Sequence, residues 1–286
     1  MKTLSQKIMA FAFMLLSVTI SAFADTWTDP STGITWTYTV LDDGTVALGG
    51  GGTSTTDAIT AVPTTTTGEL VVPAQINGLD VSSVMPYAFY NCQKITSFQF
   101  DTTISLQADA SAIFRSCIGL TNIDFVANWD TSNVTNMSYM FATTKWLASG
   151  SERMKIEDLT PLANWNVSNV TDMSYMFSGN SKISEFTQIA NWNVGKVKNM
   201  YRTFGRSGII NLTPLANWNV GNVTNMSELF VLTSISDLTP LANWNTGKVT
   251  NMAGLFSGCS KITDLTPLAN WNVSNVTTMG YTWIIT

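Results

Sequence analysis

An Asn-Trp pair recurs six times in the second half of the chain, and this repeat constrains the fold more than any other feature of the sequence. The tryptophans are Trp129, Trp165, Trp192, Trp218, Trp244 and Trp271, separated by 36, 27, 26, 26 and 27 residues. A fixed period of this length is typical of stacked supersecondary units, each of which contacts only its neighbours. Because such a stack grows in one dimension, it presents an extended surface and no single enclosed pocket.

A second apolar element follows each tryptophan at a constant distance. In one copy it consists of Val170, Met173, Met176 and Phe177. The spacing i, i+3, i+6, i+7 predicts a helix of about two turns with its apolar residues on one face. A further apolar segment between helices, such as residues 262–268, predicts one short strand or extended turn per unit. This strand must be very short, because proline cannot donate to a ladder and prolines fall inside the segment.

Each repeat has an aromatic residue at one fixed position, which in most copies directly follows the second methionine or a leucine in its place. The same position is aromatic in the earlier type of repeat. These aromatic residues are Phe89, Phe114, Phe141, Phe177, Phe204, Phe230, Phe256 and then Trp283. This column predicts one continuous solenoid of roughly eight coils. We therefore expect an α/β repeat solenoid, an array of short strands and short helices with a small N-terminal β cap.

Composition changes along the chain predict its domain organisation. The cap is expected to contain a β-hairpin, because apolar residues alternate from Ile34 to Val40 and again after an Asp43-Gly44 turn. A Gly-rich and Ser/Thr-rich stretch that follows predicts a loop. The expected divisions are a signal peptide at 1–24, the cap and loop at 25–68, and the array at 69–286, with two repeat types at 69–125 and 126–286.

The first 24 residues have the pattern of a secretory signal. Two lysines precede an apolar run that starts at Ile8, and small residues lead up to Ala24. The alternative, a membrane anchor, is less favoured because the run is too short to span a bilayer. We expect cleavage after Ala24, no membrane insertion afterwards, and a secreted or cell-surface protein.

The composition argues against several classes of function. Charged residues make up 12% of the chain and the formal net charge is −5, which disfavours nucleic acid as a partner. There is no histidine, the residue most used for proton transfer and zinc binding. The three cysteines have no ligand spacing. We therefore expect no catalytic, cofactor-binding or metal-binding residues, and a protein that is not an enzyme.

Several recurring residues have two interpretations. The tryptophans either fill the core or form an exposed ladder that stacks on sugar rings. The asparagines that precede them either bond the backbone at coil corners or bind a ligand; they are Asn128, Asn164, Asn191, Asn217, Asn243 and Asn270. Asp158, Asp237 and Asp264 recur at matching positions, which indicates turn residues and not the carboxylate pair of a glycosidase. Cys92 and Cys117 lie on adjacent coils, either as a disulfide or as buried thiols.

One insertion interrupts the period. The step from Trp129 to Trp165 is about ten residues longer than the others, and insertions in repeat arrays often protrude from the binding face. The surplus contains four candidate partner-binding residues, Trp146, Glu152, Arg153 and Lys155. Trp and Arg are frequent at interface hot spots, although a solvated loop is the alternative.

The stretch Asn128-Trp129-Asp130-Thr131-Ser132-Asn133-Val134-Thr135-Asn136-Met137-Ser138-Tyr139-Met140-Phe141 resembles the signature repeat of BspA-type leucine-rich repeat surface proteins, which is also known from mycoplasma-type lipoprotein repeats. The resemblance covers about residues 69–283. It implies a curved leucine-rich array and a bacterial protein involved in adhesion. We therefore expect non-catalytic binding of a protein partner, from a host matrix or another bacterial surface, through the extended face of the array. Carbohydrate binding through exposed tryptophans is the alternative.

Overall fold

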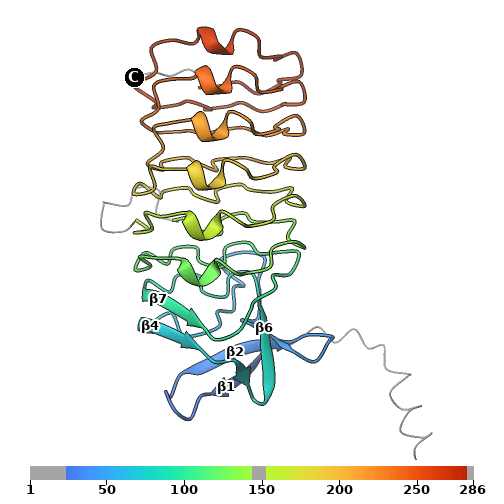
Figure 1. Cartoon of the computed structure of the whole chain (residues 1–286), viewed down its shortest axis with the longest axis vertical. Helices are drawn as coiled ribbons and strands as arrows, with labels where there is room; N and C mark the ends of the chain where they lie inside the picture. The colour runs from blue at the N-terminus through green and yellow to red at the C-terminus, as the bar shows by residue number, and fades with distance from the viewer. Residues whose placement is uncertain (1–23, 144–152, 282–286) are drawn as a thin grey trace, which may run out of the picture.

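The computed structural model describes residues 24–143 and 153–281. The chain forms an elongated stack in which successive coils lie on one another along the long axis, with the strands gathered near the N-terminal end (Figure 1). One hydrophobic core runs through the whole stack, since a single cluster of buried residues extends from Trp36 to Trp271.

Seven strands form two sheets at the N-terminal end. The larger sheet has the order β1-β2-β3-β6-β5, and β4 pairs with β7 in a separate two-stranded sheet. The strands are β1 (Asp25–Thr28), β2 (Thr35–Val40), β3 (Val46–Leu48), β4 (Thr67–Val72), β5 (Gln75–Ile76), β6 (Leu79–Val84) and β7 (Lys94–Phe100). The larger sheet joins strands from both sides of residue 68, so the predicted cap shares its sheet with the start of the predicted array.

The predicted hairpin is confirmed. β2 and β3 pair antiparallel, with Val40 opposite Val46, and Gly44 adopts the left-handed φ of +85° that the turn requires. Asp43 completes the turn by accepting a 2.9 Å hydrogen bond from the backbone N–H of Thr45. From β3 onward the direction changes: β3 with β6, and β4 with β7, pair in parallel. Parallel pairing lets consecutive coils run in the same sense along the stack.

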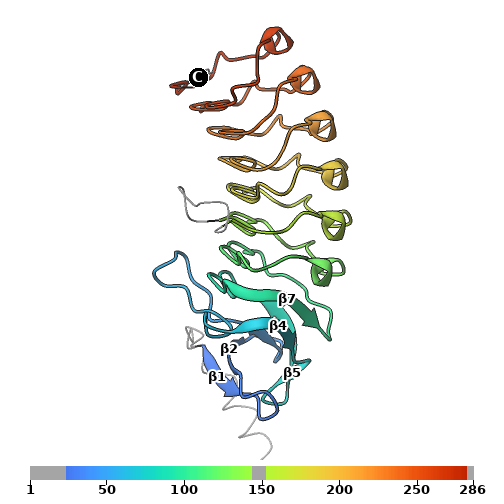
Figure 2. The same ribbon diagram turned by 90° about the vertical axis from the view of Figure 1, so that its left-hand side faces the viewer.

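The apolar segment for which a short strand or extended turn was predicted forms a single turn of 3-10 helix in the coils that follow β7. The prediction of a strand in these coils is therefore wrong. The 3-10 turns align along one side of the stack (Figure 2). They are η1 (Asp124–Val126), η3 (Thr160–Leu162), η4 (Thr187–Ile189), η5 (Thr213–Leu215), η6 (Thr239–Leu241) and η7 (Thr266–Leu268). Proline favours this outcome, since its fixed φ suits the first helical turn and its missing N–H is not needed there.

The helix predicted from Val170 to Phe177 is also wrong. Its backbone forms a chain of tight turns, in which the N–H of Met176 donates to Met173 O at 3.1 Å and that of Ser178 to Tyr175 O at 2.9 Å. Tyr175 has a left-handed φ of 59°, which an α-helix cannot accommodate. Successive turns of this kind satisfy the same apolar spacing as a helix, so the pattern did not distinguish them.

The expected fold class, an α/β repeat solenoid of short strands and short helices, is therefore contradicted. Within residues 24–143 and 153–281, helical structure is limited to the single 3-10 turns, and the regular structure is β-sheet. The coils join through isolated parallel bridges, as between Asn136 and Asp172 and between Asp172 and Asn199. Alternate backbone N–H groups donate to the next coil, for example Tyr175 to Tyr201 O at 2.8 Å and Phe177 to Thr203 O at 3.0 Å.

The predicted aromatic column is confirmed from Phe89 to Phe256, while Trp283 lies outside the described residues. Neighbouring rings are nearly parallel, and their centroids are 5.7 to 6.3 Å apart. All seven rings are at most 1% exposed. Burial of large aromatic side chains contributes on the order of 2–3 kcal/mol each, so this column is a principal source of cohesion between coils.

Candidate functional site

The tryptophans do not form an exposed ladder. All six indoles of the Asn-Trp pairs are buried, with exposed fractions of 4 to 8%. Five of them donate their N–H to a backbone carbonyl of the preceding coil; Trp192 Nε1, for instance, donates to Leu162 O at 3.0 Å. The interpretation as core residues is confirmed, and these indoles offer no face for sugar stacking.

The asparagines that precede the tryptophans are exposed, so the predicted ladder of buried asparagines at that position is wrong. The ladder lies at the bridge position instead. Asn199 donates to Asp172 Oδ2 at 2.9 Å, and Asn225 donates to Asn199 Oδ1 at 3.2 Å. Each of the three side chains also accepts a hydrogen bond from the backbone N–H two residues later in its own coil. These side chains therefore connect coils and hold their turns together.

The recurring aspartates are turn residues, as predicted. Asp237 accepts a 2.8 Å hydrogen bond from the backbone N–H of Thr239 at the start of η6, and Asp158 and Asp264 do the same for η3 and η7. Hydrogen bonds from these threonines hold the pKa of all three carboxyls below the usual value. The three residues therefore stay ionised and accept hydrogen bonds from the backbone at the start of these 3-10 turns.

The cysteines are buried free thiols, which was one of the two predicted outcomes. Cys117 donates through Sγ to Phe89 O at 2.9 Å, and Cys259 to Phe230 O at 3.0 Å, so each bonds to the coil before it. Asn180 occupies the same position in its coil and donates to Phe141 O at 2.8 Å. This position, three residues after the column phenylalanine, therefore accommodates a small side chain that can donate a hydrogen bond to the preceding coil. Within the described ranges, no three His, Cys, Asp or Glu side chains gather to hold a metal ion.

A cavity of about 160 Å³ opens on the face built by the left-handed turns. We call it the Tyr–Arg cleft and define it by five side chains that line it, Arg115, Tyr139, Tyr175, Arg202 and Arg206. Its residues come from four successive coils, which parallel stacking brings side by side (Figure 2).

Left-handed turns align several of these side chains along one face. Tyr139, Tyr175, Arg202 and Glu228 occupy equivalent positions, two residues before the column phenylalanine, and all have φ between 51° and 59°. Because the coils stack in register, these four side chains follow one another from coil to coil; Tyr139, Tyr175 and Glu228 are partly exposed, whereas Arg202 is buried. The residue type here varies from coil to coil, in contrast to the constant methionines and phenylalanines.

Aromatic rings form one wall of the cleft. Tyr139 stacks on Tyr175 with centroids 4.3 Å apart and planes 13° from parallel, and Tyr175 meets Tyr201 edge to face at 4.9 Å. The guanidinium carbon of Arg115 lies 4.2 Å from the centre of the Tyr139 ring. This distance is well within the range of a cation–π interaction, which holds the charge of Arg115 at the edge of the cavity.

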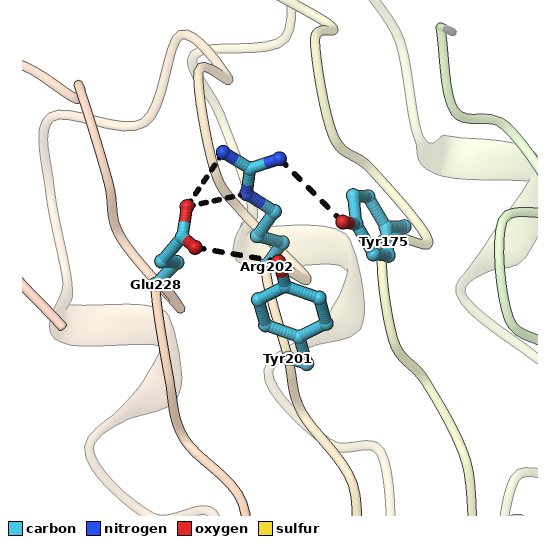
Figure 3. Close-up of polar contacts among 4 residues, drawn as sticks. All are labelled: Tyr175, Tyr201, Arg202 and Glu228. Carbon is cyan, nitrogen blue, oxygen red and sulfur yellow. Dashed lines mark hydrogen bonds and ion pairs between the residues drawn. The ribbon is translucent and has the colours of Figure 1, made fainter. Parts of the chain in front are cut away.

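Arg202 lies between Tyr175 and Glu228 at the centre of a polar network (Figure 3). Its Nε and Nη2 donate to Glu228 Oε2 at 2.6 and 2.5 Å, and its Nη1 points at the Tyr175 hydroxyl 3.5 Å away. Tyr201 donates its hydroxyl to Glu228 Oε1 at 3.3 Å. Because Arg202 is only 7% exposed, its charge is largely removed from water and depends on this network.

Burial changes the titration of several groups in the cleft. It raises the pKa of Tyr139 to about 12, with a further contribution from Tyr175. It also raises the pKa of Tyr201, reinforced by the hydrogen bond to Tyr175. Burial lowers the pKa of Arg206, and the charges of Arg202 and Arg153 lower it further. The tyrosines are thus neutral hydrogen-bonding groups at physiological pH, and the arginines crowd one another.

All four arginines of the chain belong to this region. Arg115, Arg202 and Arg206 line the cleft, while Arg153 and Arg206 line a shallower hollow next to it. In a protein with a formal net charge of −5, this face is a local concentration of positive charge.

The predicted partner-binding residues are only partly placed. Trp146 and Glu152 lie outside the described residues. Arg153 is partly exposed and borders the hollow beside the cleft, whereas Lys155 is exposed. The structure thus brings Arg153 together with Arg206, which lies 53 positions later in the sequence.

Sequence reasoning missed the tyrosines and the other three arginines. Tyr139 entered the sequence analysis only as part of the repeat signature, and Tyr175, Arg202 and Glu228 were not singled out. One signal was available, because every arginine falls between residues 115 and 206 in a chain with few charged residues.

Comparison with known proteins gives a family and no individual relative. The sequence model of the family described as "Mycoplasma protein of unknown function, DUF285" matches residues 83–157, 149–235 and 209–284, three overlapping segments in tandem. No curated protein and no solved structure matches the chain. The three segments together span more than half of the 286 residues. The chain therefore belongs to this family of mycoplasma-type repeat proteins.

Proposed function

We propose that this protein is a non-catalytic binding protein, secreted or displayed at the cell surface, that recognises a protein partner through the extended lateral face of its coils. The Tyr–Arg cleft is the observation that carries the proposal. Tyrosine and arginine are enriched at interface hot spots, because their large side chains combine apolar contact with directed hydrogen bonds. Here they gather from separate coils on one face of an otherwise acidic chain.

The division of roles within each repeat supports the same proposal. The column phenylalanines and the paired tryptophans recur from coil to coil and are buried, whereas the left-handed position holds Tyr139, Arg202 or Glu228 in different coils. A constant spine with a varied face is suited to recognition of a specific partner. Of the residues predicted in the insertion, Arg153 would extend the same face, since it borders the hollow beside the cleft.

The location of the protein is part of the proposal. The signal pattern in residues 1–24 and the resemblance to BspA-type surface proteins favour export, with a partner in a host matrix or on another bacterium. None of the helical segments in the described part of the chain is long and apolar enough to cross a membrane. Mass spectrometry of exported protein should give a mature N-terminus at Asp25; an uncleaved chain in the cytoplasm would contradict this.

The binding proposal is tested with the mature chain and two matched double variants. Arg115→Ala with Tyr139→Ala removes two partly exposed cleft residues. Lys261→Ala with Tyr281→Ala removes a cation and a tyrosine far from the cleft, and Tyr281 has the same left-handed conformation and is 76% exposed. The readout is capture of partners from host matrix and neighbouring bacteria, followed by measurement of the dissociation constant for each partner identified.

We expect the wild-type and control proteins to retain the partner and the cleft variant to lose it. Equal capture by both variants would overturn the assignment of this face. Turnover of a polysaccharide or peptide by the purified protein, lost on substitution of one carboxylate, would overturn the non-catalytic class.

A further inference from the structure

We propose that the Tyr–Arg cleft is a receptor for a carboxylate of an acidic peptide segment in the partner. This inference rests on the proposed function and names the chemistry that the binding face would recognise. Three features support this inference. They are the arginines that line the cavity, the tyrosine rings beside them, and Glu228, a carboxylate that Arg202 already binds.

Glu228 shows how the cleft holds a carboxylate. One of its oxygens accepts two N–H groups of Arg202 at 2.6 and 2.5 Å, and the other accepts the Tyr201 hydroxyl at 3.3 Å (Figure 3). Guanidinium and phenol donors thus point toward a common acceptor. Charge-assisted bonds of this kind are the strongest hydrogen bonds in proteins, and their planar geometry matches a carboxylate.

The balance of charge leaves the cavity positive. Three arginines line it, and Glu228 pairs with one of them, Arg202, across the coils. Arg153 adds a further positive charge from the adjoining hollow, close enough to Arg206 to lower the pKa of its guanidinium. An incoming carboxylate would relieve this repulsion and would be attracted to the face by its potential.

Arg115 provides donors that no carboxylate among the described residues uses. Its side chain is partly exposed, and its guanidinium carbon lies 4.2 Å from the centre of the Tyr139 ring. Its Nε is buried and has no hydrogen-bond partner in the described part of the chain, so a ligand would reach the other nitrogens of the guanidinium. A carboxylate matches the planar, charged donors of a guanidinium, which favours an anionic occupant of the cavity.

The size of the cavity indicates one side chain of a larger partner. Its volume of about 160 Å³ is smaller than the roughly 300–1,000 Å³ typical of sites that enclose a whole small molecule. Tyr139 and Tyr175 also line the cavity, and the edges of their stacked rings offer apolar contact to the methylene groups that precede a carboxylate. The coils continue on both sides of the cleft, so a peptide along the stack would meet further surface (Figure 1).

The test uses the mature full-length chain and a fluorescent oligoglutamate peptide, with oligoglutamine of equal length as the neutral comparison. Fluorescence anisotropy measures binding at low and at physiological ionic strength. Arg115→Gln removes the guanidinium, Glu228→Gln removes the internal carboxylate, and Lys261→Gln is the control for loss of one exposed cation. Tryptophan emission of each variant verifies that the buried indoles remain packed.

We expect the glutamate peptide to bind and the glutamine peptide not to bind. Arg115→Gln should weaken binding by about tenfold or more, corresponding to about 1.4 kcal/mol, and Lys261→Gln should leave it unchanged. Glu228→Gln should strengthen binding severalfold, because the ligand no longer competes with an internal carboxylate for Arg202. A purely structural role for Glu228 would not produce that gain.

Three results would overturn the inference. The first is equal binding of the two peptides, and the second is equal loss of binding in Arg115→Gln and Lys261→Gln. The third is displacement of the peptide by inorganic phosphate or a sulfated polysaccharide at matched charge concentration, which would indicate a general anion site. If the natural partner still requires Arg115 and Tyr139 while acidic peptides fail to bind, the inference fails and the proposed function stands.

Discussion

Removal of one ring from the aromatic column should weaken the whole stack. Phe177 is fully buried and lies between Phe141 and Phe204, at centroid distances of 6.3 and 6.0 Å, with Phe186 edge-on at 5.8 Å. Phe177→Ala removes the ring and opens a cavity in the centre of the array. For a Phe-to-Ala change at such a site, the expected loss is about 3–5 kcal/mol of unfolding free energy.

A second variant separates the volume of the ring from its geometry. Phe177→Leu retains most of the apolar volume but loses four ring contacts, with Phe141, Phe186, Trp192 and Phe204. An aromatic pair contributes about 0.5–1.5 kcal/mol beyond burial, and contacts that share one ring are not additive. We therefore expect a loss of about 1–3 kcal/mol for leucine, smaller than that for alanine. Ile210→Ala is the control, because Ile210 is 52% exposed, and it should stay within about 0.5 kcal/mol of wild type.

Guanidinium unfolding, followed by both tryptophan emission and far-ultraviolet circular dichroism, measures these differences. Hydrogen exchange then shows whether the coils next to Phe177 open first, as nearest-neighbour coupling requires. A loss below about 1 kcal/mol for Phe177→Ala would refute the reasoning, since no well-packed ring of this size can be removed at so little cost.

Four further outcomes are expected. Tryptophan emission should be blue-shifted and resist an added quencher, because the six paired indoles are buried; quenching as in a free indole would contradict this. A thiol reagent should label the native protein very slowly and the denatured protein fully, because burial raises the pKa of Cys92 to about 12; rapid native labelling would count against the buried thiols. Stability should fall as pH rises from about 10 to about 12, because unfolding releases Tyr139 from an environment that raises its pKa; Tyr139→Phe should reduce this fall, and an unchanged alkaline profile would argue against it. Asp237→Ala should have a lower melting temperature than wild type at neutral pH, and this difference should narrow below about pH 4, since the lowered pKa stabilises wild type only while its carboxylate is charged; a difference independent of pH would exclude this role.

The sequence predicted the features that depend on side-chain burial. The period, the phenylalanine column, the buried tryptophans and the hairpin at Asp43-Gly44 all follow from apolar spacing and turn chemistry, and the structure confirms them. The backbone between Val170 and Phe177 could not be predicted in this way. The left-handed conformation there falls on Tyr175, and tyrosine rarely adopts it. Glycine is the residue that would indicate such a conformation in a sequence, and it occupies this position in the coil with Gly254.

The cleft was missed for a different reason. Arg202 pairs with Glu228 across 26 residues, and Tyr175 reaches Arg202 across 27, so these contacts exist only once the coils are stacked in register. The period alone does not show which positions face outward. A helix predicted in place of the chain of tight turns would assign different residues to the surface. Correct assignment of the left-handed position would have aligned Tyr139, Tyr175, Arg202 and Glu228 in a single row.

The alternating backbone bonds between coils have an evolutionary consequence. Each coil accepts from one neighbour and donates to the other through the same groups, as when Met173 N–H reaches Asn199 O and Met200 N–H reaches Asn225 O. A duplicated segment of one period would find complementary partners on both sides, whatever its place in the array. Genes of this kind can gain or lose units by recombination without redesign of the interior, while the residues at the left-handed positions are free to diverge toward new ligands.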